Sequence, residues 1–327
     1  MLVLGNMGRG PASRSADVHA IFGVGLIGAS VCRHLRAECL YDQVELPFSW
    51  NRPALQSKEL SDIEQRLILL ARPDGDQYSS VSASRHIDIL WSAGKCGFSS
   101  GEDETGLELS TFKGVLELAA RLARRVPAVV IRFHLISSAG GLFEGSTAEG
   151  DESKPVPLRP YGVLKLEQEQ LLGSLDQQII SKIYRLTSVY GYIAPQCRAG
   201  LVQTLLINGV RRRTSTIVGD LSTLRDYVFS EDIGLFVSGS MLALHDRASD
   251  CYLLSSGKAS SICEVQRHIE GALGRKIYLN FVRNPTNSRD ICLGWRAMPA
   301  GWSPVDLRTG IRAVHDHWRA EGYAWRE

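Results

Sequence analysis

The sequence VHAIFGVGLIG at residues 18–28 decides the fold of this chain. Its first five residues predict a short buried strand, the next six carry a Gly-x-Gly-x-x-Gly pattern, and a helix is expected through about residue 35. Glycine permits a tight turn and lets the backbone approach a pyrophosphate, which the N-terminus of the following helix stabilises. A glycine turn that serves only chain packing is the alternative. We therefore predict a dinucleotide-binding loop with contacts from Gly23, Gly25, Leu26, Ile27 and Gly28.

Strands and helices alternate along the following residues. A further helix is expected to begin at Pro160, because proline is tolerated in the first helical turn. The order predicts right-handed crossovers and an α/β fold with a doubly wound, Rossmann-type parallel sheet, whose ligands bind beyond the carboxyl ends of the strands. Apolar runs and helical spacing predict strands at 44–50, 87–91, 128–136 and 179–186 and helices at 54–70 and 107–125.

Side chains that suit proton transfer lie near the predicted carboxyl edge. Tyr161 and Lys165 stand four residues apart on the expected helix, so they share one face. The phenol of a tyrosine is a poor base at neutral pH, but an ammonium group one turn away stabilises the phenolate. Ser137 and Ser138 follow the strand at 128–136, where a hydroxyl can steady charge on a substrate oxygen, or else cap the strand end. The set predicts proton transfer coupled to hydride transfer at a secondary alcohol.

Composition narrows the class of protein. At 327 residues, 44% hydrophobic and 22% charged, the chain is typical of a globular protein with one large or two modest domains. A formal net charge of +2 offers no electrostatic basis for nucleic-acid binding. Seven cysteines without a Cys-x-x-Cys pair argue against a metal site and favour a reducing, cytoplasmic location. No apolar stretch approaches the ~20 residues of a membrane span.

Residues 1–17 begin with a short apolar run and then become rich in glycine, arginine and serine. The run is too short for the apolar core of a signal peptide. We therefore expect an N-terminal extension outside the fold, either a disordered segment or the product of a start codon upstream of Met7.

The residues after the second predicted strand bear on the choice of cofactor. A carboxylate about 20 residues after the glycine loop would bind the adenosine ribose and favour NAD. Glu45 has that spacing, but we expect it to begin the strand at 44–50. That strand ends near Arg52, whose guanidinium suits the 2′-phosphate of NADP unless it is only a solvated loop residue. The sequence thus favours NADP slightly over NAD.

Several short motifs follow one another along the chain. In this combination the chain resembles, over residues 18–318, the extended short-chain dehydrogenase/reductase family and its NAD-dependent epimerase/dehydratase group. After the glycine loop the motifs are Asp88-Ile89-Leu90 with Ala93-Gly94, Ser137-Ser138, Tyr161 with Lys165, Val189-Tyr190-Gly191, Arg225-Asp226-Tyr227-Val228 and Trp302-Ser303-Pro304.

The resemblance implies roles for residues at the catalytic site. Tyr161 would be the general acid/base, and Lys165 would hold the nicotinamide ribose and stabilise the phenolate. Ser138, or else Ser137, would donate a hydrogen bond to the substrate oxygen. Residues 93–94 (Ala93, Gly94) would line the cofactor site.

The resemblance also implies a substrate site. Arg225 and Tyr227 match positions that reach the diphosphate of a nucleotide-sugar, and a bidentate arginine suits phosphate chemically. Arg289 is a weaker second phosphate candidate. A structural salt bridge of Arg225 with Asp226 or Asp232 is the alternative.

Domains and activity follow from the same resemblance. The leading expectation is a nucleotide-sugar epimerase that oxidises a sugar hydroxyl transiently, in cell-surface polysaccharide synthesis. A keto-sugar reductase that consumes NADPH is the runner-up, and a dinucleotide-sensing regulator without activity is an alternative of another class. Dehydration is disfavoured, because Ala139 and Gly140 stand where dehydratases carry an Asp-Glu pair. We expect a homodimer, a dinucleotide-binding domain at 18–186 plus 228–254, and a smaller, interleaved substrate-binding domain at 187–227 plus 255–327.

Overall fold

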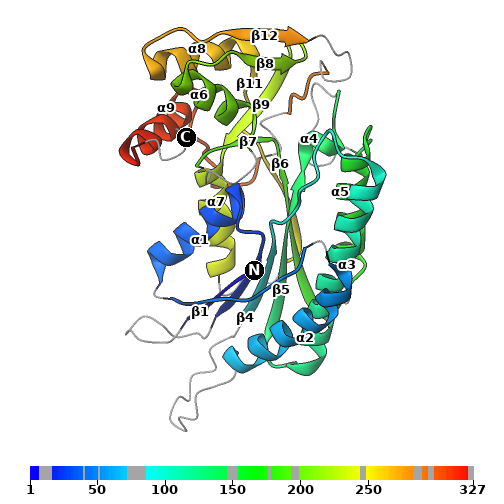
Figure 1. Cartoon of the computed structure of the whole chain (residues 1–327). Coiled ribbons are helices and arrows are strands. Elements are labelled where there is room, and N and C mark those ends of the chain that lie inside the picture. Colours follow the sequence, from blue (N-terminus) through cyan, green and yellow to red (C-terminus); the bar gives the residue numbers. More distant parts are fainter. Residues whose placement is uncertain are drawn as a thin grey trace.

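A seven-stranded sheet forms the centre of this computed structural model (Figure 1). The structure describes residues 1–6, 17–39, 41–50, 52–71, 86–145, 154–175, 178–192, 199–243, 248–282, 289–293 and 298–322. The strand order is β10-β6-β5-β4-β2-β1-β3, and neighbours run parallel except where β1 meets β2 and β3. The strands are β1 (Leu2–Asn6), β2 (Val18–Phe22), β3 (Tyr41–Glu45), β4 (His86–Trp91), β5 (Val130–Ser138), β6 (Ile179–Leu186) and β10 (Asp250–Leu254).

Helices cover both faces of this sheet (Figure 1). α1 (Leu26–Glu38) and α7 (Ser230–Leu242) pack together on one face, and α2 (Pro53–Leu70), α3 (Glu102–Arg125) and α5 (Pro160–Gly173) cover the other. Apolar residues of β2, β4 and β5 are buried in two clusters, one against each helix layer, as in parallel sheets covered on both sides. The predicted doubly wound, Rossmann-type α/β fold is confirmed. Among the described residues, no helix combines the length and the hydropathy that a membrane span requires.

The first residues of the chain form a strand of the central sheet. Residues 2–4 are at most 3% exposed, and Leu2 pairs with Ile21 of β2 on one side and with Glu45 of β3 on the other. The expectation that the N-terminal segment lies outside the fold is therefore wrong for residues 1–6, while residues 7–16 fall outside the described part of the chain. Such a short apolar run carries too little periodicity to distinguish a buried strand from a tail.

The second predicted strand is shifted along the sequence. β3 covers Tyr41–Glu45 rather than residues 44–50, so Glu45 ends the strand instead of beginning it. Pro47 lacks the N–H that a ladder needs. The aromatic side chains that favoured a strand pack into the core instead, with Phe48 against Phe22 at 5.3 Å between ring centroids and Trp50 against Trp91 at 6.0 Å.

A second layer lies beyond the carboxyl edge of the sheet (Figure 1). It has its own core of buried residues, which includes Tyr190 and Trp318. The layer holds a sheet of order β11-β9-β7 and a β12-β8 pair, and α6, α8 and α9 pack on them. Its elements are β7 (Ser188–Tyr190), α6 (Leu201–Arg211), β8 (Ser215–Val218), β9 (Leu224–Phe229), β11 (Ala259–Ser261), α8 (Ile262–Leu273), β12 (Leu279–Val282) and α9 (Leu307–Ala320).

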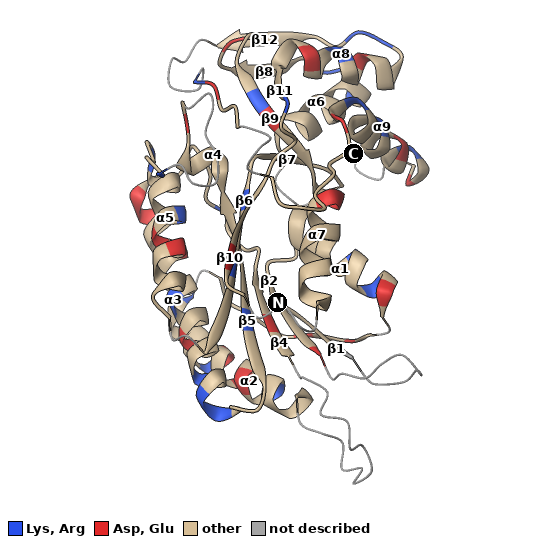
Figure 2. Ribbon diagram, turned by 180° about the vertical axis from the view of Figure 1, so that it is seen from behind, with Lys and Arg blue, Asp and Glu red and all other residues tan. Residues whose placement is uncertain are grey.

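Charged residues lie in the central strands β4 and β5 and in the edge strand β10 (Figure 2). Asp88 of β4 accepts hydrogen bonds from Arg132 at 2.6 and 2.9 Å, and lies 2.9 Å from His19 Nδ1 and 3.1 Å from His134 Nε2. Arg132 also donates to the carbonyl of Ala243, at the C-terminal end of α7, at 2.8 Å. Because these charges are buried and bonded to one another, the group fastens α7 to the sheet.

Candidate active site

The glycine loop joins β2 to α1 in a conformation that requires glycine at two positions. Gly23 has a φ of +95°, and a Cβ there would lie 2.5 Å from Ala93 Cα. A Cβ on Gly28 would lie 2.0 Å from the carbonyl oxygen of Gly23, because α1 packs directly on the loop. Gly25 is the N-cap residue of α1. The bare backbone and the helix N-terminus together fit the pyrophosphate of a dinucleotide.

A cavity of about 750 Å³ opens over this loop. It is lined by Gly23 and Gly25, by Ala93 and Gly94 after β4, and by residues of α3, β1 and β3. The volume falls within the ~300–1,000 Å³ typical of ligand pockets. Of the predicted cofactor residues, Gly23, Gly25, Ala93 and Gly94 therefore meet in one cavity of suitable size, whereas Leu26, Ile27 and Gly28 do not line it.

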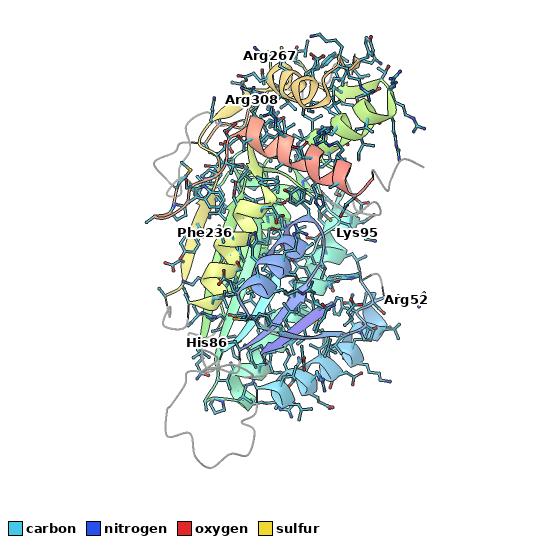
Figure 3. The ribbon with its side chains drawn as sticks, turned by 90° about the vertical axis from the view of Figure 1, so that its left-hand side faces the viewer. Arg52, His86, Lys95, Phe236, Arg267 and Arg308 are labelled. Carbon is cyan, nitrogen blue, oxygen red and sulfur yellow. The ribbon has the colours of Figure 1, made fainter. Side chains whose placement is uncertain are left out.

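The lining of the large cavity includes both a carboxylate and a guanidinium. Glu45 at the end of β3 and Arg36 in the last turn of α1 both line it, joined through Gln43. Arg36 donates to the Gln43 side chain, whose amide donates to Glu45 at 3.3 Å. Arg52, labelled in Figure 3, is exposed at the N-terminus of α2 and does not line the cavity.

A second cavity of about 160 Å³ adjoins the first. Ser137 and Ser138 from the end of β5 line it together with Tyr161 and Lys165 from α5. The two cavities share Ser92, Ala93, Gly94, Cys96 and Glu108. The structure therefore brings the four predicted catalytic candidates into one pocket beside the glycine loop.

Tyr161 and Lys165 lie one helical turn apart at this pocket. Lys165 Nζ lies 5.8 Å from the centroid of the Tyr161 ring and donates to Gln168 at 2.9 Å. The Tyr161 end of α5 approaches α4 (Ala139–Leu142) closely, because a Cβ on Gly162 would lie 2.2 Å from the carbonyl oxygen of Gly141. This contact fixes the helix that carries both residues against the end of β5.

The two serines have different partners. Ser137 donates its hydroxyl proton to Glu169 at 2.5 Å, and Glu169 also accepts a hydrogen bond from Arg185 at 2.7 Å. Ser138 is the N-cap of α4, where its oxygen accepts the Gly141 N–H at 3.1 Å. That bond engages the oxygen of Ser138 and leaves its proton to donate. Ser138 therefore suits a donor role toward a substrate better than Ser137 does.

The predicted phosphate residues belong to the second layer and line neither cavity. Arg225 of β9 donates to the carbonyl oxygen of Arg289, and burial lowers the pKa of Arg225. Tyr227 is 5% exposed, and burial raises the pKa of its phenol to about 12. Asp226 accepts hydrogen bonds from Thr187 and from a backbone N–H, each at 2.8 Å. Arg225 and Arg289 are thus adjacent, although the sequence holds them 64 residues apart.

Three residues at or beside the pocket were not among the predicted site residues. Glu108 on α3 lies 3.6 Å from Lys165 Nζ, and Gln168 bonds the same ammonium. Cys96 lines the pocket, and burial and then the carboxylate of Glu108 raise the pKa of its thiol to about 12. The thiol is therefore neutral and unsuited to act as a nucleophile. Only the three-residue spacing of Lys165 and Gln168 was visible beforehand, because the other contacts join distant segments.

The chain is similar to known proteins in sequence and in fold. A family model described as "NAD dependent epimerase/dehydratase family" matches residues 20–249. No curated protein sequence matches the chain. UDP-glucose 4-epimerase from Thermus thermophilus, solved with NAD, has 20% identity and a TM-score of 0.70, with 92% of this chain and 98% of that one covered.

Two further solved structures share the fold. UDP-glucose 4-epimerase from Thermotoga maritima, solved with UDP-glucose, has 17% identity and a TM-score of 0.70, with 93% of this chain and 98% of that one covered. RMD from Pseudomonas aeruginosa, solved with NADPH, has 18% identity and a TM-score of 0.67, with 93% and 99% covered.

Proposed function

The chain belongs to the NAD dependent epimerase/dehydratase family and is an NAD(P)-dependent enzyme, and we propose that it is a nucleotide-sugar epimerase. The observation that carries this proposal is the pocket where Ser138, Tyr161 and Lys165 meet, beside the cavity of the glycine loop. Two solved structures of the same fold are UDP-glucose 4-epimerases, which supports a nucleoside-diphosphate sugar as the substrate.

The chemistry of each side chain follows from its place in the pocket. Tyr161 would take the proton from a sugar hydroxyl and later return it, while Lys165 one turn away stabilises the phenolate. Ser138 would donate to the sugar oxygen as it becomes a carbonyl. A bound nicotinamide dinucleotide supplies the hydride acceptor for the oxidation and the donor for the return step. The glycine loop would hold its pyrophosphate, and Lys165 its nicotinamide ribose.

Of the two cofactors, we propose NAD. The expectation of NADP rested on Arg52 and on the lack of a carboxylate at the end of the second predicted strand. Glu45 ends β3 and lines the large cavity, whereas Arg52 does not. A carboxylate in that place suits the two ribose hydroxyls and repels a 2′-phosphate. Both points support NAD.

The keto-sugar reductase remains the second candidate because of one observation. Arg36 also lines the large cavity, so a guanidinium is present for a 2′-phosphate. Dehydration stays disfavoured, because Ala139 and Gly140 begin α4 without an acid or a base.

The substrate's diphosphate is proposed to lie against the second layer. The guanidinium of Arg225 bonds the backbone carbonyl of Arg289 there, and the two arginines would supply the positive charge for it. This assigns substrate binding to residues 187–227 and 255–327, and cofactor binding to 18–186 and 228–254. The homodimer through α3 and α5, the cytoplasmic location and the link to polysaccharide synthesis stay predictions.

Replacing Tyr161 tests the proposed function directly. Tyr161→Phe keeps the ring but removes the acid/base group, so turnover should fall at least about 100-fold while NAD binding is unchanged. A panel of nucleoside-diphosphate sugars, followed by NMR, measures turnover without added reductant. Interconversion of two epimers supports the epimerase, whereas conversion that consumes added NADPH supports the reductase. Unchanged turnover in Tyr161→Phe would contradict the catalytic assignment.

A further inference from the structure

Glu108 of α3 lies where the two cavities of the candidate active site meet. Its side chain is 8% exposed, and one carboxylate oxygen accepts the backbone N–H of Cys96 at 3.2 Å. A Cβ on Gly94 would lie 2.8 Å from the other carboxylate oxygen, so glycine at that position leaves room for the carboxylate. Glu108 is therefore held in place from the loop after β4.

The same carboxylate belongs to a buried set with Lys165 and Gln168. Glu108 Oε1 lies 3.6 Å from the Lys165 ammonium, which in turn donates to the Gln168 carbonyl at 2.9 Å. The Gln168 amide points back to Glu108 Oε1 at 3.5 Å. Lys165 is 5% exposed and Gln168 is fully buried, so water screens this set little.

The charge of Glu108 opposes the charge that activates Tyr161. Lys165 stabilises the Tyr161 phenolate through its positive charge, and a carboxylate beside the same ammonium offsets part of that charge. A pair held this close also keeps the ammonium in one position. Glu108 thus acts on Tyr161 without touching it.

The other titratable groups on α3 and on the loop after β4 do not lie against Lys165 as Glu108 does. Cys96 is the nearest titratable neighbour, and its raised pKa of about 12 keeps the thiol neutral. Glu104 and Lys95 are exposed and line only the large cavity. None of these three offsets the charge of Lys165 as Glu108 does.

Charged residues of α5, of β6 and of the end of α4 form two ion pairs of their own. Glu169 is bridged to Arg185 at 2.7 Å, and Glu144 to Arg159 at 2.6 Å. Each of these carboxylates is neutralised by its own guanidinium. Glu108 is therefore the carboxylate in the described residues that lies against Lys165.

We propose that Glu108 is a positioning residue for Lys165 that sets the pH range over which Tyr161 works, a role that rests on the proposed function of Tyr161. Glu108→Gln keeps the shape and removes the charge. The ammonium is then uncompensated, so the rise of turnover with pH should move about one pH unit lower. At pH values on that rising limb, the variant should turn over faster than the natural protein, which a loss of structure does not produce.

A titration without cofactor or substrate separates this proposal from the proposed function. The tyrosinate absorbance of Tyr161 is obtained by subtracting the curve of Tyr161→Phe. Its midpoint should move about one pH unit lower in Glu108→Gln. This result is expected even if Tyr161→Phe retains turnover and the catalytic assignment fails.

Three variants complete the test. Asp103→Asn removes an exposed carboxylate of α3 that lines neither cavity and should leave both curves unchanged. Glu108→Asp keeps the charge and should restore the natural pH range. Gln168→Glu adds a carboxylate beside the Lys165 ammonium and should move both curves to higher pH. This variant tests the proposal even if Glu108→Gln does not fold. Curves that do not move, or that move in the opposite direction, overturn the proposal.

Discussion

Under the proposed function, two side chains that line the large cavity would determine how it binds the adenosine end of the cofactor. Glu45 and Arg36 offer opposite charges there, and Gln43 bridges them. A carboxylate favours a ribose with free hydroxyls, whereas a guanidinium favours a phosphate. A substitution of Glu45 tests which of the two charges dominates.

Glu45→Gln should weaken the binding of NAD about tenfold and tighten the binding of NADP. The variant loses a charged hydrogen-bond acceptor, which is worth about 1.5–3 kcal/mol, and it also loses the repulsion of a 2′-phosphate. Quenching of tryptophan fluorescence measures both affinities, because Trp50 and Trp91 line the cavity. Asp42→Asn removes an exposed carboxylate of the same strand and serves as the control. Equal changes for both cofactors would rule out the role of Glu45.

At the scale of elements, β1 determines the place of β3 in the central sheet. It inserts antiparallel between β2 and β3, so β3 joins the sheet through β1 alone. Neighbouring strands are about 4.8 Å apart, and the insertion therefore moves the end of β3 one strand further from the glycine loop. The position of Glu45 thus depends on the first six residues.

A charge placed in β1 should destabilise the protein. Val3 is fully buried between Ala20 and Val44. Val3→Asp should lower the free energy of unfolding by at least about 3 kcal/mol, because an unpaired carboxylate is buried. Chemical denaturation measures the loss, with Asp42→Asn as the exposed control. A change below about 1 kcal/mol would mean that β1 contributes little to the sheet.

Elements could be predicted from the sequence only where their patterns are local. The alternation of strands and helices and the span Ile179–Leu186 were predicted correctly, because each carries its own periodicity. β1 was missed and β3 was shifted. In the first case a three-residue apolar run contains no period, and in the second the aromatic residues pack against distant partners.

At the scale of the whole molecule, the buried charges in the sheet make stability depend on pH. His134 is fully buried beside Asp88, and burial lowers its pKa from the ordinary value of about 6.5. His134 therefore binds a proton near pH 6.5 in the unfolded chain, whereas in the folded chain it binds one only at lower pH. The stabilisation is complete above that pH and is lost as the pH falls toward the lowered pKa.

The free energy of unfolding should consequently fall as the pH drops below about 6.5, by up to ~1.4 kcal/mol per pH unit for this one group. Denaturation curves across this range measure the slope. His134→Asn should make it shallower, although the variant is less stable at every pH. Burial alone would raise the pKa of Asp88, but hydrogen bonds from the two histidines hold that pKa well below its usual range. Asp88 therefore loses its contribution to the free energy of unfolding only below about pH 4. An unchanged slope in His134→Asn would contradict the assignment.

The sequence by itself determined the glycine loop, the doubly wound sheet, and the helix that carries Tyr161 and Lys165. All of these depend on residues close together in the chain, where backbone sterics and periodicity act. Only the tertiary structure decided the rest: the strand from the first residues, the place of Glu45, the difference between the serines, and the meeting of Glu108 with Lys165. These depend on packing between distant segments, and side chains that meet across such distances leave no spacing in the sequence.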